Sequence, residues 1–394
     1  ARGGSAAPLA PRRASLGEWW FMMTTDPCEQ AESNDIKRHY SYSPATWAKH
    51  KAPDRYLRHF MRLPTSSVLK RQSGSLVIVG LASIFIAAAD AYPQVLGDWH
   101  LPETPFNLSA TALGLLLALR VSESYGRFRS AHLGLASMNS SLREVMRMLA
   151  TSFRLQPSAT AGESMQELVR KVVALHEVTL GHLRGTPPVA LLRKLASVGV
   201  PEADGAEVLA TGHAPSAALA DLSGLVRALE LAGTVDSGDV AAVNAQLNEF
   251  SHHLSVCEQI QRNPISIPYT RHTSRVLWIW LLALPLAIVQ KLDALVVPVS
   301  LLLSFGLLGI EDIAVQIEDP FTVIDMEDYG MQLRRSVKVF QERVAPCSAG
   351  PASSPSRVSS RASALRRAVW RLRTRQRSRS VSRETRVGLP GVNL

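Results

Sequence analysis

Polar residues occur at regular spacing within one strongly apolar stretch of the sequence. Asn107 and Thr111 are four residues apart, and Leu115 follows after four more. On an α-helix this spacing places the three side chains along one stripe. Polar groups inside a membrane helix usually face a helix interface or a water-filled path, where their dipoles can replace part of an ion's hydration. The residues alone leave both alternatives open.

Two arginines follow this stretch. Arg120 and Arg127 are about two helical turns apart, so they share one helix face just beyond the apolar residues. Arginines at the mouth of a pore concentrate anions, because they focus positive potential there. We therefore predict that Arg120 and Arg127 attract anions.

The sequence lacks the usual signatures of enzymes. It contains no GxSxG or HExxH motif, and its three cysteines are scattered. His252 and His253 are adjacent and would point to different faces of a helix, so they cannot chelate one metal ion together. The apolar runs hold no histidine, cysteine or paired carboxylates for general acid–base catalysis. We expect a protein that is not an enzyme and requires no cofactor.

Four apolar runs indicate membrane helices, although each is shorter than the roughly 20 residues of a simple span. Buried helices of a soluble bundle are the alternative, but such helices carry one apolar stripe. The runs here are apolar on every face: Leu76–Ala89, Leu108–Leu119, Val276–Val289 and Ala294–Ile310. We predict membrane segments at about 74–92, 106–121, 274–290 and 293–311.

The charges beside these runs are distributed unevenly. The connector 91–106 carries Asp98 and Glu103 but no lysine or arginine, whereas basic residues crowd the approach to the first run and follow the second. This is the positive-inside pattern of two helical hairpins. It places both termini and the middle of the chain on one side, in cytosol or stroma.

The middle of the chain, 130–270, reads as soluble helices. Ser164–Leu183 has apolar residues at helical spacing, and Gly185–Pro188 and Gly212–Pro215 predict breaks between helices. Over the whole chain, 46% of residues are hydrophobic and 19% are charged, which fits a membrane protein.

The net charge of +10 belongs to the C-terminal tail. Residues 346–394 contain eleven arginines and one acidic residue, Glu384, so the rest of the chain is neutral. No RNA-binding domain accompanies this tail, and we expect no nucleic-acid partner. Its Ser/Arg/Pro-rich composition predicts disorder. Residues 1–40 are also predicted to be disordered, as a transit-peptide remnant or an ordinary terminus.

Several segments resemble one known family. They are LGLLLALRVSESYGRF at 113–128, Asn263–Pro285, Leu295–Val299 and Glu311–Phe321. In this order, and over residues 40–345, they resemble the bestrophin family. The segments at 42–50 and 63–74 are most similar to its plant and algal members of thylakoid membranes.

The resemblance implies an all-α membrane protein with four transmembrane helices per subunit. A cytosol- or stroma-side helical bundle would complete a channel domain at 41–345, and five identical subunits would surround one central pore. The implied function is passive conduction of chloride or bicarbonate across a thylakoid membrane, with both termini in the stroma. Its partners would be its own copies, membrane lipid and small anions. The alternative is a membrane tether that recruits a protein partner through its basic tail.

The resemblance also assigns positions within the pore. The family's narrow neck matches Asn107, Thr111 and Leu115, where animal members carry bulkier apolar side chains. Polar side chains should make this neck easier to wet and less tightly gated. A second constriction matches Val240 and Ala241.

A calcium clasp is a further feature of animal members of the family. The matching segment here contains Asp319, Asp325, Glu327 and Asp328, but apolar residues interrupt it. Ca²⁺ requires about six to eight oxygen ligands. We expect no strong calcium activation, and a solvated acidic loop is the alternative.

Overall fold

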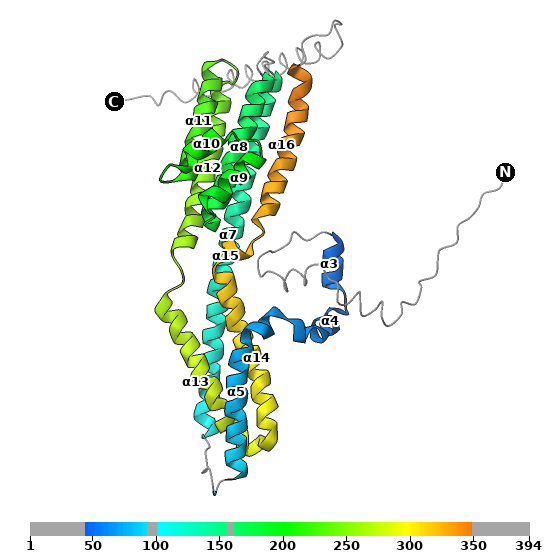
Figure 1. Cartoon of the computed structure of the whole chain (residues 1–394), viewed down its shortest axis with the longest axis vertical. Coiled ribbons are helices and arrows are strands. Elements are labelled where there is room, and N and C mark those ends of the chain that lie inside the picture. The colour runs from blue at the N-terminus through cyan, green and yellow to red at the C-terminus, as the bar shows by residue number, and fades with distance from the viewer. Residues whose placement is uncertain (1–43, 93, 95–100, 156–160, 349–394) are drawn as a thin grey trace, which may run out of the picture. The chain divides into compact units, whose positions relative to one another are not determined.

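The computed structural model describes residues 44–92, 94, 101–155 and 161–348. The predictions for residues 1–40 and for the tail after Ser348 lie outside the described residues. The chain separates into the units Ala1–Val344 and Ala345–Leu394, and the first is described here. The secondary-structure elements of the described residues are helices (Figure 1): α3 (Pro44–Lys51), α4 (Arg55–Met61), η1 (Leu63–Thr65), α5 (Ser67–Ala91), α7 (Glu103–Leu155), α8 (Ala161–Arg184), α9 (Pro188–Ser197), α10 (Glu202–Leu209), α11 (Ala214–Leu231), α12 (Ser237–Arg262), α13 (Ile267–Leu292), η2 (Asp293–Leu295), α14 (Val296–Glu318), α15 (Pro320–Val323) and α16 (Met326–Ser348).

Three helical stretches of the described chain are long and apolar enough to cross a membrane. They are α5, α7 and the stretch Ile267–Glu318. The last consists of α13 and α14, joined through η2, where Asp293 adopts a positive φ of 47°. Helices α13 and α14 contact each other and α5, and the three lie side by side in Figure 1. The four predicted apolar runs therefore lie on α5, α7, α13 and α14.

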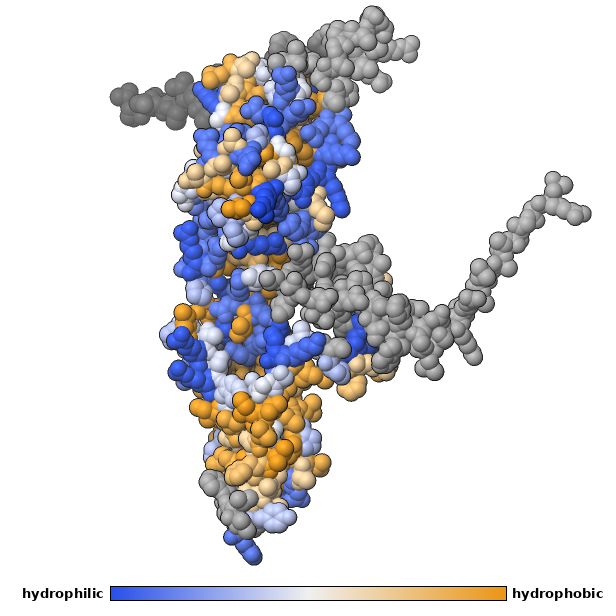
Figure 2. All heavy atoms as spheres, viewed as in Figure 1, coloured by the Kyte–Doolittle hydropathy of each residue, from blue (hydrophilic) through white to orange (hydrophobic). Residues whose placement is uncertain are grey.

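The apolar helices expose most of their side chains. Only 28%, 17% and 28% of the most apolar windows of the three stretches are buried within the chain. Figure 2 shows apolar residues gathered over the end of the unit where α5, α13 and α14 lie. Ile78, Ile279 and Leu302 are each more than half exposed. So much exposed apolar surface requires a lipid environment or another copy of the chain.

Helix α7 is longer than the predicted membrane segment, which stops at about residue 121. It continues without a break to Leu155. The one proline between Glu103 and Leu155 is Pro105, in the first turn, where no helical hydrogen bond is lost; none follows between Phe106 and Leu155. Its second half is amphipathic and buries Leu135, Leu142 and Leu149. One rigid helix therefore belongs to both the apolar region and the polar bundle.

The bundle has one continuous core formed by α7, α8, α9, α11, α12, α15 and α16, with contributions from α10. On α8, the apolar side chains of Leu168, Val172 and Leu175 are completely buried, as the helical spacing predicted. The predicted breaks are also confirmed, because α8 ends at Arg184 and α11 begins at Ala214. Burial of such stripes is the main source of stability for helices of this kind.

Helices α7 and α12 pack closely at Gly134. A methyl group at this position would lie 2.7 Å from Sγ of Cys257 and 3.8 Å from the backbone oxygen of His253. Cys257 is itself fully buried, and burial raises the pKa of its thiol to about 12. The neutral thiol therefore acts as a small apolar group that fills the space left by Gly134.

We expect Gly134→Ala to destabilise the protein by about 1–2 kcal/mol, because overpacking outweighs the better helix propensity of alanine. The midpoint of thermal unfolding in detergent measures this effect. Adding Cys257→Ala should restore most of the loss, since it removes the clashing sulfur. Gly224→Ala is the matched control, because no atom lies within 4 Å of that position. An unchanged midpoint for Gly134→Ala would contradict the close packing of α7 against α12.

Candidate functional site

The polar stripe of the apolar region lies on the outer surface of α7. Asn107, Thr111 and Leu115 are all exposed, and Leu115 retains 64% of its accessible surface. Leu113 and Leu117, on the opposite face, are buried against α5, α13 and α14. The chain thus packs one face of α7 internally and leaves the stripe free for water, lipid or another copy of the chain. The predicted alignment of the three side chains on one face is present.

Arg120 has no exposed surface and lies between α7 and α14. Its Nη2 donates a hydrogen bond of 2.7 Å to Oε2 of Glu318, and its Nε is 3.8 Å from Oε1 of Glu311. Glu311 also accepts a hydrogen bond from Ser274 on α13, and Glu318 accepts one from the backbone N–H of Ile265. A buried arginine is tolerated because two carboxylates compensate its charge.

Arg127 holds the next turn of α7 to the chain segments around it. Its guanidinium donates hydrogen bonds to the backbone oxygens of Glu318, Asn263 and Ile260, at 3.3, 2.5 and 2.7 Å. These oxygens lie at the ends of α14 and α12 and in the linker to α13. Arg127 therefore joins α7 to the point where the apolar helices meet the bundle.

These contacts argue against the predicted role of Arg120 and Arg127 in attracting anions. The charge of Arg120 is buried and paired, and Arg127 is partly buried with its donors used by backbone carbonyls. Both residues lie on the inner face of α7, away from the exposed stripe. They position helices instead. Glu311 and Glu318 have the same seven-residue spacing as the two arginines, but this spacing does not identify the partners, because both carboxylates lie near Arg120.

Arg129 is a further cationic side chain of α7, and its sequence position did not mark it as a site. It is exposed on α7 and, by helical periodicity, lies on the same face as Asn107 and Thr111. Among the described residues it has no ion-pair partner closer than 4.0 Å. Its charge is therefore presented to the surroundings of the stripe.

The predicted second constriction is divided between two environments. Val240 is 7% exposed and belongs to the bundle core, so it cannot line a pore. Ala241, the next residue of α12, is exposed, as are Ala245 and Asn248 further along. Of the two predicted residues, only Ala241 remains available for a constriction, because one residue along a helix changes the direction of the side chain by about 100°.

The four acidic residues of the predicted calcium segment do not form one cluster within the described chain. Glu327 contacts Lys194 and Arg184 at 3.1 and 3.2 Å. An oxygen of Asp325 accepts the backbone N–H of Glu327, and Asp328 accepts a hydrogen bond from Gln332. Asp319 is exposed at the end of α14. Burial acts to raise the pKa of Glu327, but the contacts with Lys194 and Arg184 outweigh it and keep that pKa low. Glu327 acts as an anchor for α16.

His176 is buried on α8 beside this ion-pair network. Burial lowers the pKa of its imidazole to about 4; the carboxylate of Glu177 opposes this shift, while Lys194 and Arg334 act in the same direction as burial. An unfolded chain binds a proton at this histidine below about pH 6.5, while the folded chain does not until about pH 4. The folded state therefore loses stability as the pH falls through this window.

We expect the wild-type protein to lose up to about 3 kcal/mol of stability through His176 between pH 6.5 and pH 4. The variant His176→Leu should show a flatter pH dependence of thermal unfolding over this window. His253→Gln, which removes a histidine outside the core, should retain the wild-type slope. Equal slopes for wild type and His176→Leu would contradict the burial of a neutral imidazole.

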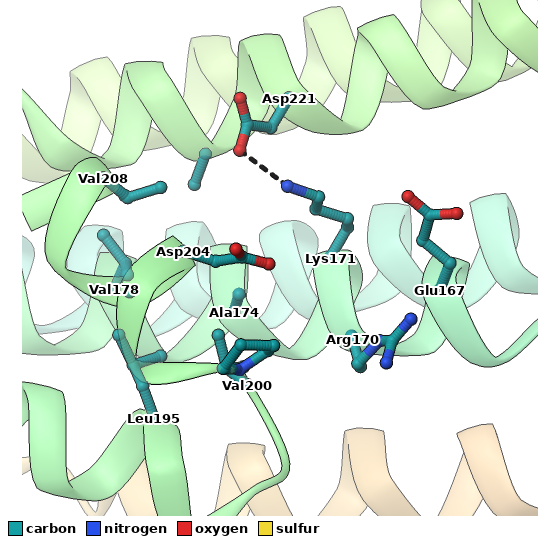
Figure 3. A pocket seen from close by; sticks show the side chains of 13 residues that line it. Glu167, Arg170, Lys171, Ala174, Val178, Leu195, Val200, Asp204, Val208 and Asp221 are labelled. Atoms are coloured by element: carbon teal, nitrogen blue, oxygen red, sulfur yellow. Dashed lines mark hydrogen bonds and ion pairs between the residues drawn. The ribbon is translucent and has the colours of Figure 1, made fainter.

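A small pocket of about 100 Å³ lies between α8 and the helices α9, α10 and α11. Figure 3 shows Lys171 and Asp221 facing each other across it, with 2.8 Å between Nζ and Oδ2. Val178, Leu195 and other apolar side chains line it together with Glu167 and Asp204. The charged side chains that line the pocket are of both signs, and its lysine, Lys171, is paired with Asp221, so the pocket offers no selective site for an anion.

Comparison with known proteins identifies the family. The bacterial/fungal bestrophin protein family matches residues 46–339 of this chain. A voltage-dependent chloride channel 2 from Arabidopsis thaliana, described as chloroplastic, is 26% identical over 73% of this chain and 69% of its own length. A voltage-dependent anion channel-forming protein of Ralstonia nicotianae is 27% identical over 57% of this chain and 72% of its own.

Solved structures give the same result. A bacterial bestrophin homologue from Klebsiella pneumoniae is 25% identical, with a TM-score of 0.61 over 68% of this chain and 97% of its own. A second structure of that homologue, with an aspartate-to-alanine mutation, has a TM-score of 0.63 and covers 69% of this chain. With its long apolar helices, the protein is an integral membrane protein. The family match spans most of the chain, which therefore belongs to the bestrophin family.

Proposed function

We propose that this protein is the subunit of an anion channel, assembled from five identical chains around one pore, that conducts chloride or bicarbonate passively. The observation that carries the proposal is the exposed stripe Asn107, Thr111 and Leu115 on α7. The chain buries the opposite face of α7, so the polar groups of Asn107 and Thr111 face outward from a membrane segment. Facing a water-filled path satisfies them, whereas facing lipid does not.

The relatives support this assignment by their descriptions. Two chloroplastic proteins of Arabidopsis thaliana are described as voltage-dependent chloride channels, and several bacterial relatives as anion channel-forming proteins. The chloroplastic relatives support a chloroplast membrane. We propose the thylakoid membrane, with both termini on the stromal side as the positive-inside pattern predicts. Passive conduction requires no covalent chemistry, so the channel function needs neither catalytic residues nor a cofactor.

The mechanism follows from the side chains of the stripe. Asn107 can donate two amide hydrogens to a passing anion, and Thr111 can donate one hydroxyl hydrogen. These hydrogen bonds replace part of the anion's hydration shell. Leu115 narrows the path without binding the ion. The exposed charge of Arg129, on the same face of α7 beyond the apolar region, raises the local anion concentration in place of the buried Arg120.

The test is conduction by the purified protein in planar bilayers. Reversal potentials are recorded under asymmetric KCl and again after bicarbonate replaces chloride. A reversal near the anion equilibrium potential is expected, and the bicarbonate shift ranks the two ions. The mass of the detergent-purified assembly is determined in parallel, and five chains are expected.

The absence of current above that of protein-free bilayers, from a preparation with five chains, would overturn the channel proposal. The remaining function would then be a membrane tether acting through the tail. Deleting the residues after Ser348 tests that function, because a tether loses its partner while a channel keeps its current.

A further inference from the structure

Three potential metal ligands converge on the surface of the bundle, away from the stripe on α7. They are His182 near the end of α8, His213 at the start of α11 and Glu258 on α12. Nε2 of His182 and Nε2 of His213 lie 2.9 and 2.6 Å from the same oxygen, Oε1 of Glu258. Among the described residues, this is the one group of three or more histidine, cysteine or acidic side chains close enough to hold a metal ion.

We propose that these three side chains form a binding site for a divalent metal ion of the zinc class. Two imidazole nitrogens and one carboxylate oxygen are a ligand set that Zn²⁺ binds in proteins, with water completing the coordination. Hard cations such as Ca²⁺ prefer oxygen ligands alone and larger ligand numbers. The proposal is independent of the conduction function.

The geometry requires little movement to accept the ion. The three ligand atoms lie within 4.8 Å of one another. Zinc bonds of about 2.0–2.2 Å in a tetrahedral site separate the ligand atoms by roughly 3.3 Å. The two histidine nitrogens must therefore each retreat from Glu258 by less than about 1 Å. The side chains are 27%, 32% and 16% exposed, so the ion and a bound water can reach them from solvent.

The surrounding contacts hold the ligands in a suitable orientation. Nδ1 of His213 lies 2.7 Å from Oγ of Ser216. An imidazole that binds a metal through Nε2 carries its hydrogen on Nδ1, and Ser216 can accept that hydrogen. In the metal-free structure the backbone N–H of Ser216 donates to Nδ1 of His213 at 3.3 Å, a bond that is lost when Nδ1 carries the hydrogen. The same N–H would keep its bond of 3.1 Å to the carbonyl oxygen of His213. Gln261, one turn after Glu258, donates to the carbonyl oxygen of Leu183, which ties α12 to the end of α8.

A hydrogen-bonded triad without metal is the competing explanation. The same helix α12 provides a matched comparison, because His253 and Glu249 form an isolated pair at 3.0 Å. That pair has the same chemistry but lacks a third ligand. If the triad is a metal site, a metal ion should bind at His182, His213 and Glu258 but not at the pair His253–Glu249. If the triad is only a hydrogen-bonded group, the two sites should bind metal equally weakly.

The experiment uses the full-length protein in detergent, stripped with a chelator and dialysed against ZnCl₂. Bound zinc is measured by elemental analysis. We expect His213→Gln and Glu258→Gln each to bind one zinc ion per chain fewer than wild type. The control His253→Gln should bind as much as wild type. Ser216→Ala should weaken zinc binding by about 10–100-fold, as the loss of an orienting partner does.

Cobalt provides a second measurement that does not depend on the variants folding. Co²⁺ bound to the wild-type protein should give visible absorption bands of a nitrogen- and oxygen-ligated site, without a thiolate band, and excess Ca²⁺ should not displace it. Equal zinc content in wild type and Glu258→Gln would overturn the proposal. So would a cobalt spectrum of the wild type dominated by thiolate ligands, or displacement of the ion by Ca²⁺.

Discussion

Replacing Arg120 by methionine is expected to destabilise the protein by about 3–5 kcal/mol, because one partner of a buried ion pair is removed. The change leaves the carboxylates of Glu318 and Glu311 without their cation in the interface between α7 and α14. Methionine approximates the length of the lost side chain, so packing alone contributes little of the effect. The midpoint of thermal unfolding in detergent measures it.

Two further variants show whether the lost stability of Arg120→Met comes from the unpaired carboxylates. The double variant Arg120→Met/Glu318→Gln should recover part of the lost stability, since fewer unpaired carboxylates remain buried. Arg129→Met, on the exposed face of the same helix, should leave the midpoint close to that of wild type. If Arg120→Met and Arg129→Met unfold at the same temperature, the buried ion pair is not a determinant of stability.

Making the stripe on α7 fully apolar is expected to reduce single-channel conductance roughly tenfold or more, because hydrophobic constrictions dewet. The double variant Asn107→Leu/Thr111→Leu adds this apolar surface without changing charge. The opposite change, Leu115→Asn, should raise conductance, since it extends the polar stripe by one turn. Single-channel recording in planar bilayers under symmetric KCl measures both effects.

The control lies one residue along the same helix. Ala112 is exposed but points about 100° away from Thr111, so Ala112→Leu adds apolar bulk outside the stripe. It should leave the conductance near that of wild type. A loss of conductance with Ala112→Leu as large as with the double variant would show that the stripe does not line the conduction path.

Sequence periodicity was sufficient for features that depend on neighbours along the chain. The apolar runs predicted the helices α5, α7, α13 and α14, and the spacing of Asn107, Thr111 and Leu115 predicted one helix face. The apolar stripe of α8 and the breaks before α9 and α11 followed in the same way. These features are local, because helix geometry alone relates residues three or four positions apart.

The same periodicity could not decide which face of a helix is buried. Val240 and Ala241 are adjacent, and the packing of α12 against the core placed Val240 inside and Ala241 outside. The sequence predicted a membrane segment that ends at about residue 121 and a helix face that continues to Arg127. It did not predict that α7 continues to Leu155 or that the charge of Arg120 is compensated by carboxylates on another helix.

By itself, the sequence determined the helical class, the apolar segments and the position of the polar stripe within one of them. Tertiary structure alone decided the partners of the charged groups. Arg120 meets Glu318 from 198 residues away, which turned a predicted anion attractor into a buried anchor. His182 and His213 meet Glu258 from 76 and 45 residues away. Such meetings depend on how helices pack, and no spacing along the chain encodes them, because long-range contacts are fixed by the shape of the whole core.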